Sequence, residues 1–153
     1  MIEDCRLVNL PKFVDLRGNL SFVEGGIHIP FDFKRVYYLY GLAKGATRAG
    51  HGHRNLKQFM IALAGSFTVE IDDGERVKVF KLDRPDVGLL IPPMMWRDLN
   101  SFSEGAVCMV LASDVYDEAD YFRDRAQFIN AVKIQANISE GSFSKSSEFK
   151  SEI

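Results

Sequence analysis

The chain has few cysteines and no long apolar segment. Its two cysteines, Cys5 and Cys108, lie far apart and form no C-x-x-C pair, so a disulfide framework and a paired-cysteine redox or zinc motif are not indicated. We interpret both as reduced thiols without a catalytic role. No segment approaches the roughly 20 apolar residues that a membrane span requires, and no charged-then-apolar targeting signal is present. We therefore expect a soluble, cytoplasmic protein with no membrane partner.

An excess of charge of one sign is also lacking. The 19 basic and 21 acidic residues give a formal net charge of −2. This balance gives no general attraction to nucleic acid, although a few local arginines suffice to bind one nucleotide. The chain, with 153 residues, is long enough for one domain with a buried core. We expect the domain to span 1–134 and a polar tail to follow at 135–153, loosely held or disordered from Ser139 onward.

The chain does contain many short apolar segments separated by turn residues. Two of them, 66–71 and 77–82, alternate apolar and polar residues around Asp72-Asp73-Gly74, which predicts a β-hairpin. Closely spaced strands without helices between them indicate an all-β sandwich or barrel. Residues 117–129 are charged with spaced aromatics, which predicts a short helical segment lying on this body. The other expected strands cover 35–40, 58–63, 87–91 and 106–112.

A histidine pair marks the candidate site. His51 and His53 are two residues apart, and in an extended strand such residues point to the same face. We therefore expect both imidazoles to enter one cavity side by side, with Gln58 near it. Two imidazoles in a cavity indicate either a metal site or proton-transfer chemistry.

The stretch from Gly45 to Gly65 resembles the first cupin motif, G-x5-H-x-H-x4-E-x6-G, with Gln58 at the glutamate position. In the segment that corresponds to the second cupin motif, Arg97 stands where a third histidine would be. A neutral amide is a poor ligand, and a guanidinium stays protonated and has no lone pair to donate. Two of the four usual ligands are thus missing, and we interpret the site as metal-free. The fold implied by the resemblance is the cupin double-stranded β-helix, a jelly-roll barrel.

A narrower resemblance covers roughly residues 5–130. Arg48-x-x-His51-x-His53, Leu89–Pro93 with Trp96, and the segment from Leu111 to Asp124 are similar to the nucleotide-sugar 3,4-ketoisomerases. The resemblance implies an isomerase, without metal or other cofactor, that acts on dTDP-4-keto-6-deoxyglucose. It would move the keto group from carbon 4 to carbon 3 in the biosynthesis of 3-amino-3,6-dideoxy sugars. It also implies a homodimer that exchanges N-terminal strands.

Moving a ketone to the neighbouring carbon requires proton transfer through an enediol. One imidazole with a near-neutral pKa can serve both carbons, and our hypothesis is that His51 takes the proton from carbon 3 and returns it to carbon 4. Tyr37 or His53 would move a proton between the two oxygens. The family pattern places a tyrosine on the strand before the histidine motif, which Tyr37 matches, although it is otherwise an ordinary core aromatic. Arg48 would neutralise charge on the enediolate or the diphosphate.

Four further residues have two interpretations each. Arg97 would bind ligand oxygens bidentately or pair with a carboxylate such as Asp98. Arg17 is a pocket arginine on the family pattern and a solvated loop charge otherwise. Gln58 would orient a histidine or a sugar hydroxyl. Trp96 is either a packing residue or a platform for the nucleobase.

Other functions remain open from the residues alone. A dTDP-sugar 3,5-epimerase is a metal-free cupin too, but its histidine–aspartate pair and tyrosine acid belong to a different motif. A metal-dependent dioxygenase or isomerase would need the missing ligands. A nucleotide-sugar-binding cupin without catalysis would use the same cavity.

Overall fold

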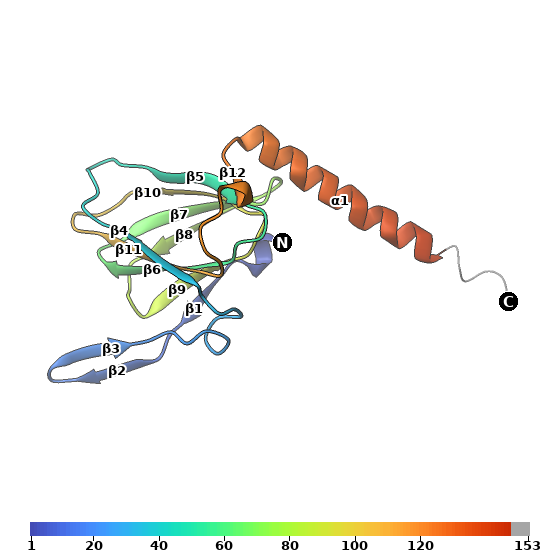
Figure 1. The fold of residues 1–153 in the computed structure, drawn as a ribbon. Helices are drawn as coiled ribbons and strands as arrows, with labels where there is room; N and C mark the ends of the chain where they lie inside the picture. The colour runs from blue at the N-terminus through green and yellow to red at the C-terminus, as the bar shows by residue number, and fades with distance from the viewer. Residues whose placement is uncertain (148–153) are drawn as a thin grey trace.

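A computed structural model describes residues 1–147 and consists mainly of two five-stranded antiparallel sheets (Figure 1). The prediction of an all-β barrel with a C-terminal helix is confirmed. One sheet has the order β1-β9-β6-β11-β4, and the other β12-β5-β10-β7-β8. The strands of the first sheet are β1 (Arg6–Asn9), β4 (Arg35–Leu39), β6 (Gln58–Ala64), β9 (Val87–Ile91) and β11 (Val107–Ala112). Those of the second are β5 (Arg48–His53), β7 (Phe67–Asp72), β8 (Val77–Leu82), β10 (Trp96–Asn100) and β12 (Tyr121–Phe122).

The main core lies between the inner faces of these two sheets. Side chains at every second position point inward because successive residues of a strand face opposite sides. On β7, for example, Phe67, Val69 and Ile71 are buried, and they pack with Val110 of β11. The predicted hairpin is present as β7–β8, and the Asp72 carboxylate accepts a 2.6 Å hydrogen bond from the Gly74 N–H in its turn.

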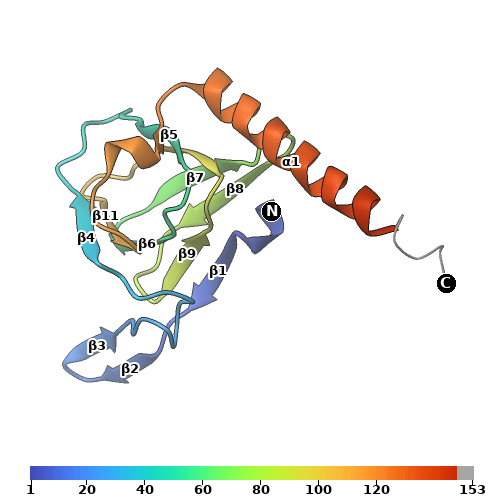
Figure 2. The same cartoon turned by 45° about the vertical axis from the view of Figure 1, so that its right-hand side comes forward.

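An N-terminal hairpin stands away from the barrel. Its strands β2 (Lys12–Asp15) and β3 (Gly18–Ser21) pair with each other, and every residue in them is exposed. Figures 1 and 2 both show it extending from the end of β1 beyond the sheet edge. A short 3₁₀ turn, η1 (Ile2–Asp4), precedes β1.

The C-terminal helix begins later than the sequence predicts. Within residues 117–129, the first part forms a 3₁₀ turn, η2 (Glu118–Asp120), and then β12, because Tyr121 and Phe122 pair with His53 and Gly52 of β5. The helix α1 runs from Arg125 to Ser147 and passes through the start of the expected polar tail. Residues 148–153 of that tail lie outside the described residues, and a domain boundary at 134 stays a prediction.

Helix α1 is attached to the barrel by a small apolar cluster. Phe128 is fully buried against Trp96 and Phe122, and the helix then extends past the barrel (Figures 1 and 2). Within residues 1–147, no helix is both long and apolar enough to cross a membrane. Cys5 and Cys108 are free and buried, and burial raises the thiol pKa to about 11 and about 12 respectively.

Candidate active site

Strand β5 carries the histidine pair and is bent by a β-bulge next to it. Its register with β10 shifts between Arg97 and Asp98, and Ala49 and Gly50 adopt positive φ values of 70° and 68° there. Bulges of this kind redirect side chains near functional sites. The rings of His51 and His53 lie 4.9 Å apart, edge to face.

A cavity of about 250 Å³ lies on the inner side of the barrel next to His51. It collects five of the predicted site residues from four strands: Tyr37 of β4, Arg48 and His51 of β5, Gln58 of β6 and Arg97 of β10. Strands β4 and β6 belong to one sheet and β5 and β10 to the other, so it is the packing of the two sheets that brings the five side chains together. The cavity is therefore the candidate active site.

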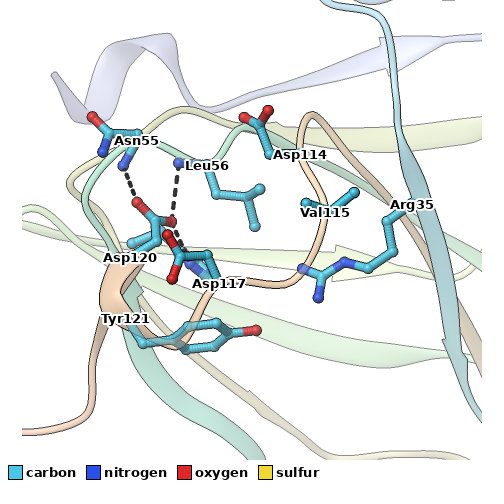
Figure 3. A pocket seen from close by; sticks show the side chains of 9 residues that line it. Arg35, Asn55, Leu56, Asp114, Val115, Asp117, Asp120 and Tyr121 are labelled. Carbon is cyan, nitrogen blue, oxygen red and sulfur yellow. Dashed lines mark hydrogen bonds and ion pairs between the residues drawn. The ribbon is translucent and has the colours of Figure 1, made fainter.

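His53 borders a second, adjoining cavity of about 290 Å³ (Figure 3). The expectation that both imidazoles enter one cavity is met in part: the ring centroids lie 4.9 Å apart, and the rings line two adjoining cavities. Strand β12 pairs with the end of β5 and places Tyr121 against both rings, at 5.0 Å from His51 and 4.3 Å from His53, centroid to centroid. Tyr121 and Arg35 line both cavities.

A chain of hydrogen bonds joins Arg97, Gln58 and Tyr37. The Arg97 guanidinium donates to Gln58 Oε1 at 2.9 Å, and Gln58 Nε2 donates to the Tyr37 hydroxyl oxygen at 2.9 Å. Because a guanidinium only donates, the Gln58 amide oxygen must face it, which leaves the amide N–H groups facing Tyr37. Tyr37 thus accepts from Gln58, and its own hydroxyl hydrogen is free to be donated into the cavity.

Arg97 has unused donors inside the barrel. The side chain is 1% exposed, and within residues 1–147 its Nε and Nη2 have no hydrogen-bond partner. Asp98, the carboxylate considered as an ion-pair partner, instead accepts a 3.0 Å hydrogen bond from Trp96 Nε1. Burial lowers the Arg97 pKa to about 10, so the group remains charged at neutral pH. A buried cation with free N–H groups is suited to bind an oxygen that carries negative charge.

Burial keeps both His51 and Tyr37 uncharged at neutral pH, and the His51 pKa lies below the near-neutral value expected from the sequence. Burial, and then the Arg97 charge, lower the His51 pKa to about 4, so its imidazole is neutral and can act as a base at pH 7. Burial raises the Tyr37 pKa to about 12, which keeps its hydroxyl protonated. At neutral pH the cavity therefore holds a neutral imidazole that can take a proton and a tyrosine hydroxyl that can donate one, next to the Arg97 charge.

Asp120 is a site residue that the sequence did not reveal. Its carboxylate accepts from His53 Nδ1 at 3.0 Å and from the backbone N–H groups of Asn55 and Leu56 at 2.7 and 3.2 Å (Figure 3). Asp120, like Tyr121 and Arg123, belongs to the 111–124 segment that carries the family resemblance. That resemblance was the only available signal, because none of these residues has a motif spacing of its own.

Two predicted substrate-binding residues lie outside both cavities. Trp96 packs against Phe122 and Phe128 beneath helix α1, on the outer side of β10. Arg17, in the turn of the N-terminal hairpin, has a side chain that is 90% exposed and forms an ion pair with Asp15 at 2.6 Å. Within one chain, neither residue reaches His51.

The residues at the former ligand positions do not fit a metal. The site offers two imidazoles together with an amide and a guanidinium, and a cation would meet the Arg97 charge. Within the described part of the chain, no group of three or more His, Cys, Asp and Glu side chains is placed to hold a metal ion. The metal-free interpretation stays a prediction that metal analysis tests.

The family of the chain follows from sequence comparison. The family model described as "FdtA: WxcM-like, C-terminal" matches residues 3–133. The chain belongs to this family. It is 41% identical over 133 residues to the TDP-4-oxo-6-deoxy-alpha-D-glucose-3,4-oxoisomerase of Aneurinibacillus thermoaerophilus, which covers 87% of this chain and 94% of that protein.

Solved structures of this family are similar throughout the barrel. QdtA, a sugar 3,4-ketoisomerase from Thermoanaerobacterium thermosaccharolyticum in complex with TDP, is 40% identical with a TM-score of 0.85, over 88% of this chain and 98% of that chain. A histidine-to-asparagine mutant of QdtA in complex with TDP-4-keto-6-deoxyglucose gives a TM-score of 0.84 at 40% identity, over 87% and 96%. The predicted resemblance to 3,4-ketoisomerases is confirmed. ChmJ, a 3'-monoepimerase from Streptomyces bikiniensis, is 16% identical with a TM-score of 0.68, over 77% and 68%, and shares the fold alone.

Proposed function

We propose that this isomerase moves the keto group of dTDP-4-keto-6-deoxyglucose from carbon 4 to carbon 3, through an enediol and without a metal. The observation that carries the proposal is the neutral imidazole of His51 in a cavity with a tyrosine donor and a buried arginine, in a chain of this family. The product would enter the biosynthesis of 3-amino-3,6-dideoxy sugars.

In the proposed reaction His51 removes the proton from carbon 3. The electrons of the C–H bond form the double bond of the enediol, and the carbonyl oxygen on carbon 4 takes a proton from Tyr37. The hydroxyl on carbon 3 then gives its proton to the ionised Tyr37 oxygen as the new carbonyl forms, which restores the tyrosine, and His51 returns its proton to carbon 4. Arg97 and Arg48 would stabilise the negative charge on the enediolate or the diphosphate, an effect that is strong in a buried site.

The product itself tests the proposal. Incubation of the protein with dTDP-4-keto-6-deoxyglucose, followed by NMR of the sugar carbons, should show the carbonyl at carbon 3. Inversion at carbons 3 and 5 without migration would instead indicate an epimerase, and an unchanged sugar would indicate a binding protein. Stoichiometric iron or zinc that is required for turnover would contradict the metal-free mechanism.

His51→Asn tests the base. An asparagine cannot take the proton, so kcat should fall by at least about 100-fold, the lower end of what a positioned general base contributes. Binding of dTDP, measured by calorimetry, should stay within a few-fold of the wild type. A near-normal kcat would exclude His51 as the base.

We also propose that the enzyme is a homodimer that exchanges N-terminal strands. Support comes from the wholly exposed β2–β3 hairpin and from an apolar groove of about 300 Å³ on the outer face of the first sheet. Exchange would also bring Arg17 to the site of the second copy. A nucleotide sugar is too polar to cross a membrane unaided, so the proposed place of action is the cytoplasm, where the nucleotide is made.

A further inference from the structure

The second histidine has an acceptor atom with no partner. His53 is fully buried, and within residues 1–147 its Nε2 makes no hydrogen bond. Leaving a buried polar atom unpaired destabilises a protein, because the atom loses its hydrogen bonds to water. Such an atom is accounted for when a ligand supplies the missing partner.

The surroundings of Asp120 fix which nitrogen of His53 carries the hydrogen. The Asp120 carboxylate accepts a backbone N–H on each of its oxygens, from Asn55 and Leu56, so both oxygens act as acceptors. Its remaining partner, His53 Nδ1 at 3.0 Å, must then be the N–H of the ring. Burial and the nearby Arg97 charge lower the His53 pKa, so the ring does not carry a second proton. The unpaired Nε2 therefore carries no hydrogen, and its lone pair is free to accept a hydrogen bond.

We propose that Asp120 is a positioning residue that holds His53 as the Nδ1–H tautomer, so that Nε2 accepts a hydrogen bond from a sugar hydroxyl during the keto shift. This inference rests on the proposed function. It assigns a hydrogen-bond donor to one of the two reacting sugar oxygens and a hydrogen-bond acceptor to the other. Tyr37, which accepts from Gln58, has a hydrogen to donate to the oxygen of the old carbonyl. His53 Nε2 accepts a hydrogen bond from the hydroxyl that becomes the new carbonyl, and so orients that hydroxyl while its proton passes to Tyr37.

The tautomer of the wild-type enzyme provides the first test. Two-bond ¹H–¹⁵N correlation spectra of ¹⁵N-histidine-labelled protein without ligand distinguish Nδ1–H from Nε2–H, and His53→Asn assigns the signal. We expect Nδ1–H for His53. An Nε2–H ring would overturn the inference, and this measurement does not depend on whether any Asp120 variant folds.

Asp120→Asn provides the second test. Asparagine has one acceptor oxygen in place of two, so if that oxygen stays with the Asn55 N–H, its NH₂ group faces His53 and forces the Nε2–H tautomer. We then expect kcat to fall by about 100-fold or more with a much smaller change in KM. If the tautomer is unchanged, kcat should stay within a few-fold. A flipped tautomer with normal kcat, or a large kcat loss with the Nδ1–H tautomer retained, would overturn the inference.

Asp124→Asn is the matched control. Asp124 lies four residues later in the same segment and accepts a 2.9 Å hydrogen bond from the Gln127 N–H at the start of α1, a role that asparagine also performs, and it lines neither cavity. It should leave the tautomer and kcat unchanged although it removes the same charge. Wild-type turnover separates the two hypotheses: without carbonyl migration the proposed function fails, whereas migration together with an Nε2–H ring refutes only the role of Asp120.

Discussion

The chemistry of single residues in this site depends on which atom carries each hydrogen. Gln58 and Arg97 stand at positions that bind metal in other cupins, and here they form a chain of donors that ends at the Tyr37 oxygen. Each replacement is unsuitable as a ligand, and together they leave a free hydroxyl hydrogen in the cavity. The same two residues therefore account both for the two missing metal ligands and for the oriented Tyr37 donor.

The His51 pKa predicts the acid limb of the pH profile. Because burial and Arg97 lower this pKa to about 4, the neutral form is available at pH 7 and is lost only as the pH falls through that value. We expect kcat/KM, which reports the free enzyme, to stay level from neutral pH down to about 5.5 and to decline only below that. An acid limb centred near the ordinary imidazole value of about 6.5 would contradict the assignment.

Gln58→Glu should reverse the direction of the hydrogen bond between residue 58 and the Tyr37 hydroxyl. The introduced carboxylate would still accept from Arg97, but it would also take the Tyr37 hydroxyl hydrogen, which is then withheld from the substrate. We expect kcat to drop by about 100-fold without loss of the fold, as judged by circular dichroism. The control is the same change in a Tyr37→Phe background, where it should add little because the two residues act as one unit. Additive losses would show that Gln58 acts independently of Tyr37.

Among the structural elements, the central strands hold the site in place by tight packing on both faces of the first sheet. On the outer face, Gly88 of β9 lies directly beneath the ring of Phe59 from β6, and both residues are buried. A side chain at position 88 would collide with this ring, so glycine is required there by close approach rather than by a turn. The inner face of β6 carries Gln58 and Met60 into the cavity.

Gly88→Ala should therefore destabilise the barrel. Displacing a fully buried aromatic ring costs about 1–3 kcal/mol, and we expect a loss of that size in the free energy of unfolding, measured by urea denaturation. Phe59→Leu should create room for the added methyl group, so the double variant should lose clearly less than the sum of the single losses. If the losses of the two single variants simply added up, the methyl group at position 88 would not be in contact with the Phe59 ring.

The sequence predicted the elements whose residues are close together in the chain, and it failed where distant segments meet. The β7–β8 hairpin and the set Tyr37, His51 and Gln58 follow from strand periodicity and motif spacing. Asp120 lies 67 residues from its partner His53, and no local pattern links them. The start of α1 was misplaced for the same reason, because pairing with β5 holds residues 121–122 in a strand that their own composition does not demand.

At the scale of the whole molecule, a single chain exposes apolar side chains on surfaces that would be polar if they faced only water. Side chains such as Phe13 and Leu20 of the hairpin and Val36 and Leu63 of the first sheet are between 45% and 63% exposed. Apolar groups gathered in this way usually mark an interface. The hairpin and the outer groove both present apolar side chains, which is consistent with the proposed exchange between two copies.

Val36→Glu should therefore convert the proposed dimer into monomers. Val36 lines the outer groove and is 47% exposed, so a charge placed there would be buried unpaired if the hairpin of a second copy packs on it. We expect light scattering coupled to gel filtration to give the mass of one chain for this variant and of two chains for the wild type. Val79→Glu is the matched control, because Val79 is 63% exposed on β8, in the opposite sheet, and its substitution should leave the proposed dimer intact.

If the monomeric variant also binds dTDP-sugar more weakly while His51 keeps its pKa, the second copy contributes to the site, as the placement of Arg17 on the hairpin suggests. A wild-type protein that runs as a single chain would refute the exchange and would leave Arg17 as a solvated loop charge.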